Sequence, residues 1–238
     1  MEFFSHRKDM LVYLTMFEKR LNFLELERHK LINSYFTLRT IVGLLGMCLP
    51  FVVALGGMIF FNIGLQTSVS AYYYTGMRDV LVGSLWAIAF FLFSYKGYDL
   101  ADEIAGKLCF LFAIGVAVFP TTPDGATDPH VLLIGSIHLV CAALLFITLT
   151  YYAIFLFTKT HPDIPPTRRK IQRNAVYLLC GLLMTFSILS MAILAVLPAA
   201  ISSALSGYQP VFWLEALAIV AFGISWFVKG EAILRDEE

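Results

Sequence analysis

The basic residues of this 238-residue chain are confined to a few places, and their distribution constrains the fold more than any other feature. Of the 17 Lys and Arg residues, all but Arg78 lie near the N-terminus, near the C-terminus, or in every second connection between apolar segments. In multi-pass membrane proteins, Lys and Arg gather in the loops on the cytoplasmic side. The alternation therefore predicts an integral membrane protein with both termini in the cytoplasm.

The overall composition predicts the same class of protein. The chain is 59% hydrophobic and 14% charged, whereas soluble domains carry about 25% charged residues. The net charge is zero, which argues against nucleic acid as a partner because that binding needs a concentrated basic face. The four cysteines lie in apolar segments at spacings that match no metal or redox motif, so we expect no disulfide. Membrane lipids are the expected surroundings.

Six apolar segments approach or exceed the length that a membrane-spanning helix requires. A hydrocarbon core of about 30 Å needs about 20 residues in a helix. The sequence therefore predicts an all-α, polytopic bundle of six transmembrane helices within residues 37–238. The predicted spans are residues 38–61, 80–95, 104–119, 131–157, 175–200 and 211–228.

Residues 1–36 precede the first span and have a different pattern. Apolar side chains recur every three or four residues from Met10 to Leu31, apart from Arg28, while Lys and Glu occupy other faces. This spacing predicts an N-terminal amphipathic helix. We favour a helix lying in the cytoplasmic interface. A homo-oligomer seam and a docking face for a cytosolic partner remain open.

Ionisable residues inside a span are costly and face the bundle interior, so each is a candidate functional residue. Asp79, His138 and Glu215 lie in the outer part of three different predicted spans. We treat them as candidate catalytic residues, and as candidate metal ligands if a metal is present. Each also has a structural interpretation: Asp79 can cap its helix, and the other two can hydrogen-bond neighbouring helices.

The loop before the second span places three consecutive tyrosines next to a charge pair. Tyr72, Tyr73 and Tyr74 are followed by Arg78. The Arg fork matches phosphate and carboxylate groups, so we predict that these four residues bind an anionic or amphiphilic head group. The alternative is that the tyrosines only anchor the protein at the level of the lipid head groups.

Two stretches carry a resemblance to known proteins. These are Tyr72-Tyr-Tyr-Thr-Gly-Met-Arg-Asp79 and Ser94-Tyr-Lys-Gly-Tyr-Asp99, supported by Phe112-Ala-Ile-Gly-Val-Ala-Val-Phe-Pro120. They resemble segments of bacterial six-span membrane proteins that have no assigned activity. The resemblance implies a place in the bacterial inner membrane and brings no reaction with it.

Asp79 and His138 are also similar to parts of the zinc site of the alkaline ceramidases and adipoQ-receptor-like membrane hydrolases. Those proteins bind zinc through three histidines within seven spans. The similarity implies a metal-dependent hydrolase, but the last span here offers Glu215 where a histidine would be needed. Zinc is therefore a cofactor that we consider without favouring it.

The favoured function is binding or transport of a lipid or small amphiphile in a polar pocket of the outer leaflet. A membrane-embedded hydrolase acting on a lipid is the first alternative, although the chain has no HExxH, GxSxG or Gly-rich phosphate-binding motif. A membrane scaffold or assembly protein that recruits a partner through residues 1–36 is the second.

Overall fold

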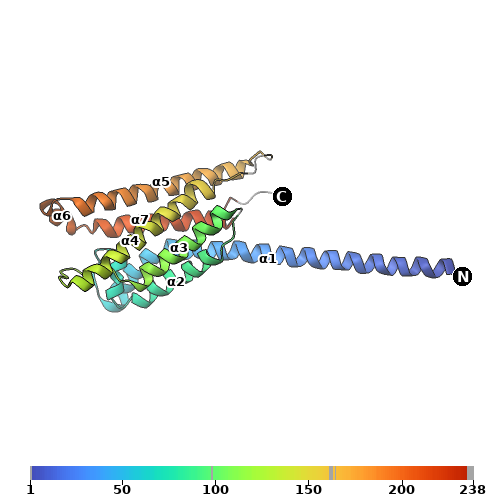
Figure 1. Cartoon of the computed structure of the whole chain (residues 1–238), viewed down its shortest axis with the longest axis horizontal. Coiled ribbons are helices and arrows are strands. Elements are labelled where there is room, and N and C mark those ends of the chain that lie inside the picture. The colour runs from blue at the N-terminus through green and yellow to red at the C-terminus, as the bar shows by residue number, and fades with distance from the viewer. Residues whose placement is uncertain (1, 98, 161–162, 164, 235–238) are drawn as a thin grey trace.

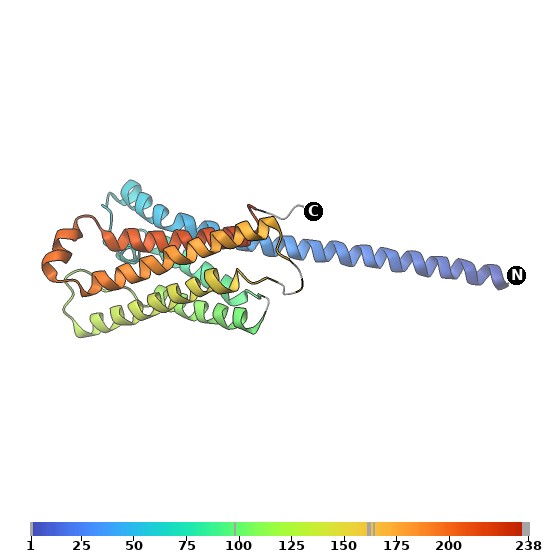
Figure 2. The ribbon, with the colours of Figure 1, turned by 90° about the horizontal axis from the view of Figure 1, so that it is seen from above.

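The computed structural model describes residues 2–97, 99–160, 163 and 165–234, and it is helical, with no strand among them. Long helices run side by side in a bundle, and α1 extends far beyond one end of it (Figures 1 and 2). The elements in chain order are α1 (Glu2–Phe61), the 3₁₀ turn η1 (Ser70–Tyr74), α2 (Arg78–Ser94), α3 (Leu100–Val118), α4 (Pro129–Tyr151), the π-helical turn η2 (Tyr152–Leu156), α5 (Arg168–Val196), α6 (Ala199–Ser206) and α7 (Pro210–Lys229).

Four helical segments are long and apolar enough to cross a membrane, which fits an integral membrane protein. They are Met16–Phe61 within α1, Pro129–Leu156 formed by α4 and η2, α5, and α7. The other two predicted spans are also helices, α2 and α3, but they are not among these four. α2 has only 17 residues, and α3 carries the charged residues Asp102, Glu103 and Lys107 in its first half.

The N-terminal segment differs from the prediction. α1 is one helix of 60 residues that continues through the predicted boundary between residues 36 and 37. No Gly or Pro precedes Ile41 in this region, so nothing in the sequence ends the helix there. Its N-terminal part points away from the bundle and does not lie across its end, as Figures 1 and 2 both show.

Three of the helices begin at a residue whose side chain caps the helix N-terminus. The Asp99 side chain accepts hydrogen bonds from the backbone N–H groups of Ala101 and Asp102, and Asp102 reciprocates, which forms a capping box at α3. Asp128 caps α4 ahead of Pro129, and Thr167 caps α5.

Proline ends the fifth span early. The sequence predicted a span to residue 200, but α5 ends at Val196. The residue before a proline is driven out of the helical region, and Leu197 is extended with ψ 145°. The chain then forms the separate short helix α6, and Pro210 opens α7 at its first turn.

α1 and α7 approach each other closely because glycines meet at their contact. A Cβ atom added to Gly43 would lie 2.5 Å from the backbone nitrogen of Phe227. On the opposite helix, Gly223 faces the backbone of Met47 in the same way. Small residues at such crossings permit backbone contact between membrane helices.

The buried side chains form two clusters, one toward each end of the bundle. We call the end with Lys96, Lys159 and Gly230 the inner end, and the end with η1, the loop 119–128 and α6 the outer end. The inner cluster is centred on Trp226 and the outer one on Tyr72 and Phe212. Residues from both clusters line the cavity described next.

Candidate functional site

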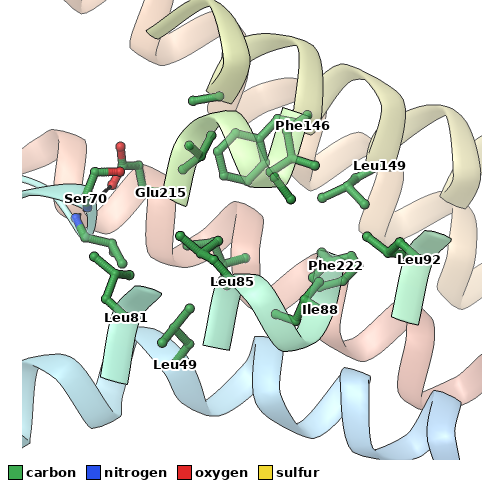
Figure 3. Close-up of a pocket in the computed structure, with 16 residues that line it drawn as sticks. Leu49, Ser70, Leu81, Leu85, Ile88, Leu92, Phe146, Leu149, Glu215 and Phe222 are labelled. Atoms are coloured by element: carbon green, nitrogen blue, oxygen red, sulfur yellow. Dashed lines mark hydrogen bonds between the residues drawn. The ribbon is translucent and has the colours of Figure 1, made fainter. Parts of the chain in front are cut away.

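A cavity of about 70 Å³ lies between the two core clusters, where α1, η1, α2, α3, α4 and α7 face one another (Figure 3). Fourteen of its 16 lining residues are apolar, with Leu85, Ile88 and Phe146 among them, and Ser70 and Glu215 form one end. On α2 the lining extends from Leu81 to Leu92, which is about 16 Å at 1.5 Å per residue. The shape is that of a narrow apolar space with a single polar end.

Glu215 is held in place by backbone groups of a distant segment. Its Oε2 atom accepts hydrogen bonds from the N–H groups of Val69 at 2.7 Å and Ser70 at 3.2 Å, at the start of η1. The carboxylate thus satisfies donors that a 3₁₀ turn leaves unpaired. No donor to Oε1 is found among the residues that the structure describes, and Glu215 lines the cavity.

His138 is buried and fixes the end of the preceding helix. Its Nδ1 atom lies 2.7 Å from the carbonyl oxygen of Phe119, the residue after α3. Because a carbonyl can only accept, Nδ1 must carry the proton. The ring therefore satisfies a carbonyl that the helix C-terminus leaves unpaired, and the structural interpretation of His138 accounts for this geometry.

Arg78 and Asp79 are both exposed in the first turn of α2. Arg78 lies over the ring of Tyr73, 4.2 Å from its centroid, and donates a hydrogen bond of 2.6 Å to the Tyr73 hydroxyl. Asp79 does not cap the helix as predicted, since Met77 occupies the cap position without a side-chain hydrogen bond. Arg78 and Tyr73 are thus brought together, whereas Asp79 stands apart.

The other two tyrosines are already engaged in the fold. Tyr72 is fully buried against Phe212, so it does not form part of an exposed head-group site as the sequence suggested. The Tyr74 hydroxyl donates a 2.7 Å hydrogen bond to the carbonyl of Thr121 and links η1 to the loop 119–128. Tyr72 and Tyr74 therefore connect η1 to α7 and to the loop 119–128.

The tentative metal set of Asp79, His138 and Glu215 is not assembled. Glu215 binds the backbone of η1, His138 binds the end of α3, and Asp79 faces outward. Across the described ranges, no three His, Cys, Asp or Glu side chains lie together in a way that could hold a metal ion. The residues in these places do not fit a zinc centre, and we derive no metal chemistry from them.

An ion cluster at the inner end went unrecognised in the sequence. Lys159 donates to both carboxylate oxygens of Asp99 at 2.8 Å and to Oδ2 of Asp102 at 3.0 Å. The Asp102 side chain is 1% exposed, whereas that of Asp99 is 54% exposed. The hydrogen bond from Lys159 holds the pKa of Asp99 below its ordinary value. Lys159 therefore joins the start of α3 to the end of η2.

Aromatic rings pack densely beneath this ion cluster. Trp226 is fully buried, and its ring centroid lies 4.9 Å from that of Tyr95 and 5.1 Å from that of Phe157. The Tyr152 hydroxyl donates to the backbone carbonyl of Asp102 at 2.7 Å. Asp102, Tyr152 and Trp226 thus tie together α3, η2 and α7.

The spacing of Asp99 and Asp102 was a usable signal, because an acidic pair at positions i and i+3 ahead of an apolar run is a capping pattern. Lys159 could not be paired with it from the sequence, since 57 residues separate Lys159 from Asp102. The lining of the cavity was also missed, because its leucines look like ordinary core residues. No family model, curated protein or solved structure matches this chain.

Proposed function

We propose that this chain is a six-span membrane protein, with both termini in the cytoplasm, that binds a lipid-like amphiphile within its helical bundle. The observation that carries the proposal is the cavity, which is apolar along its length and polar only at Ser70 and Glu215. Ligand sites are typically concave and apolar, with a few polar groups that orient the ligand. A molecule with an apolar chain and one polar head matches this arrangement.

The lengths and positions of α2 and α3 support six spans. Their 17 and 19 residues correspond to about 26 and 28 Å of helix, close to the hydrocarbon thickness of about 30 Å. Both helices lie alongside the four longer ones in Figures 1 and 2. Their ends have suitable partners: Lys159 neutralises the acidic start of α3, and Tyr35 donates to the carbonyl of Lys96 after α2.

The cytoplasmic position of the inner end is supported by its charges. Arg39 donates to the carbonyl of Lys229, Lys170 donates to the carbonyl of Phe157, and Lys159 binds Asp99. These contacts bring basic residues from three separate parts of the sequence to the same end of the bundle. A concentration of Lys and Arg at one end is typical of the cytoplasmic side.

The size of the cavity sets a condition on binding. An engineered apolar cavity of about 150 Å³ takes up benzene, and the cavity here is about 70 Å³. An alkyl chain longer than a few carbons therefore requires Phe146 and the neighbouring leucines to move apart. We expect the bound state to differ from the unbound one mainly at α4.

Leucine substitutions at two different alanines test the proposal. Ala142 lines the cavity, whereas Ala87 on α2 is exposed outside the bundle. Ala142→Leu adds three carbons inside the cavity, and Ala87→Leu adds the same group on the outer surface. After gentle purification, mass spectrometry of extracted lipid should find an amphiphile in the wild type and in Ala87→Leu but not in Ala142→Leu. Equal amounts in all three, or none in any, would contradict the proposal.

A second candidate function is partner binding through residues 1–36. Phe17, Leu24 and Leu31 are 61%, 55% and 71% exposed on the part of α1 that extends beyond the bundle. Exposed apolar side chains of this kind mark interaction sites. Deleting residues 1–30 would then abolish function in cells while the remaining bundle keeps its bound amphiphile. Loss of the amphiphile on this deletion would argue against a separate role for the segment.

A further inference from the structure

We infer that the bound amphiphile has a single chain and a head group that donates a hydrogen bond, such as a primary alcohol or an amine, and that Glu215 selects it. This inference rests on the proposed function, because it assigns the polar end of the same cavity. It adds the chemical class of the ligand and the atom that recognises it.

The geometry of Glu215 leaves one carboxylate oxygen for a ligand. The backbone N–H groups of Val69 and Ser70 both donate to Oε2. They come from consecutive residues of the same turn, so they fix the orientation of the carboxylate. Oε1 has no donor in the described part of the chain, and it belongs to a residue that lines the cavity.

The chemistry of Oε1 decides which head groups fit. Both backbone N–H groups donate to Oε2, so the lone pairs of Oε1 remain able to accept a hydrogen bond. A head group that donates would give Oε1 the partner that the described residues do not supply. No Lys or Arg is among the 16 lining residues, so nothing in the cavity would neutralise a phosphate or carboxylate head. Hydroxyl and amine groups are the matching donors.

The narrowness of the cavity argues for one chain. Leu85, Ile88 and Phe146 approach it from α2 and α4, and Figure 3 shows them around a space that extends away from Ser70 and Glu215. The lining extends about 16 Å along α2, so an extended alkyl chain can lie parallel to the helices once Phe146 and the neighbouring leucines move apart. A two-chain lipid would have to separate the helices that line the cavity.

Two isomeric probes test the inference without any charge on the ligand. 1-Dodecanol has a hydroxyl donor, whereas 1-methoxyundecane has the same atoms and only an acceptor. Both are offered to the full-length protein in lipid nanodiscs, and the retained amount is measured by mass spectrometry against empty nanodiscs. The wild type should retain the alcohol with an affinity roughly tenfold higher than that of the ether, as one hydrogen bond to a charged group implies.

Glu215→Gln gives a sharper test, because it changes the free atom from an acceptor to a donor. The amide oxygen can still accept both backbone N–H groups, so η1 stays anchored, and the amide nitrogen then takes the place of Oε1. The preference for the alcohol should fall roughly tenfold and the ether should bind as well as the alcohol. Glu215→Ala removes both functions and serves as the reference for loss of the anchor.

The outcomes separate this inference from the proposed function. If alcohol and ether bind equally to the wild type and Ala142→Leu blocks both, the cavity is a binding site but Glu215 does not select the head group, and the inference is overturned. If neither probe binds to the wild type and Ala142→Leu has no effect, the proposed function itself fails. The comparison of the two probes in the wild type needs no variant to fold.

Discussion

Trp226 at the inner end and Glu215 at the outer end lie on the same helix, yet their surroundings differ. Trp226 is fully buried and contacts five other aromatic rings. Glu215 is half-buried, makes two hydrogen bonds to backbone groups, and faces a cavity. Closely packed side chains with no voids between them stabilise a fold. Incomplete packing next to a polar group leaves room for a ligand. We therefore expect most of the stability to come from the inner end, and the proposed binding site to lie toward the outer one.

The largest effect on stability should come from Trp226. Trp226→Ala removes the ring at the centre of the inner cluster and should lower the free energy of unfolding by roughly 3–5 kcal/mol. The measurement is denaturant unfolding in mixed micelles. Trp213→Ala is the control, because Trp213 is 54% exposed on the same helix. An equal loss in both variants would contradict the contrast between the two ends.

The ion cluster should have the next largest effect. Lys159→Ala leaves the buried Asp102 carboxylate without its cation and should cost about 2–3 kcal/mol, less than a fully enclosed pair because Lys159 is itself 30% exposed. Lys107→Ala breaks an ion pair with Glu103 whose side chains are 55% and 45% exposed, and should cost under about 0.5 kcal/mol. Similar losses in the two variants would show that the burial of Asp102 does not matter.

The same cluster predicts a response to acid. Lys159 lowers the pKa of Asp99 in the folded protein, so the folded state binds fewer protons than the unfolded state near that pKa. The stability that Asp99 contributes is complete above its ordinary pKa of 3.8 and is lost as the pH falls through the lower folded value. Unfolding of the wild type should therefore become easier below about pH 4. The change with pH should be smaller in Lys159→Ala, and an unchanged profile would contradict the assignment.

Substituting His138 should have an intermediate effect on stability, because its side chain makes one hydrogen bond, to the carbonyl of Phe119 in the outer half of the bundle. His138→Ala should cost about 1–2 kcal/mol because it leaves the carbonyl of Phe119 unsatisfied. His138→Asn places an amide donor near the Nδ1 position and should restore most of the loss. If the Asn variant is no better than Ala and bound amphiphile falls in both, His138 has a role in the site and not only in the end of α3.

The sequence alone predicted much of the fold. The predicted spans 80–95, 104–119 and 211–228 agree with α2, α3 and α7 to within four residues at each end, because apolar length and capping residues are local signals. Two helix ends differ from the predicted bounds. α1 continues through residue 36 because no helix-breaking residue lies there, and α5 ends before Pro198 instead of at residue 200.

The candidate site was predicted less well, because its parts meet only in three dimensions. Glu215 was named as a candidate from the sequence, but its backbone partners at Val69 and Ser70 are 145 or more residues away and could not be predicted. Arg78 and Tyr73 were predicted to bind a head group together, and in the structure Arg78 donates a hydrogen bond to the Tyr73 hydroxyl. Asp79, His138 and Glu215 do not come together in the structure. The position of a residue within a span predicts its depth in the membrane, but it does not predict toward which neighbouring helix the side chain points.

The smallest expected effect concerns Arg78, and it decides which part of the outer end binds the ligand. Arg78 is exposed and contacts only Tyr73 among the interactions described, so Arg78→Ala should cost less than about 1 kcal/mol. It should also leave the bound amphiphile at the wild-type level, since Arg78 does not line the cavity. Lipid extraction and mass spectrometry of Arg78→Ala beside Ala142→Leu measure this directly. Loss of the amphiphile in Arg78→Ala, with retention in Ala142→Leu, would move the site from the cavity to the tyrosine loop and reverse the assignment made here.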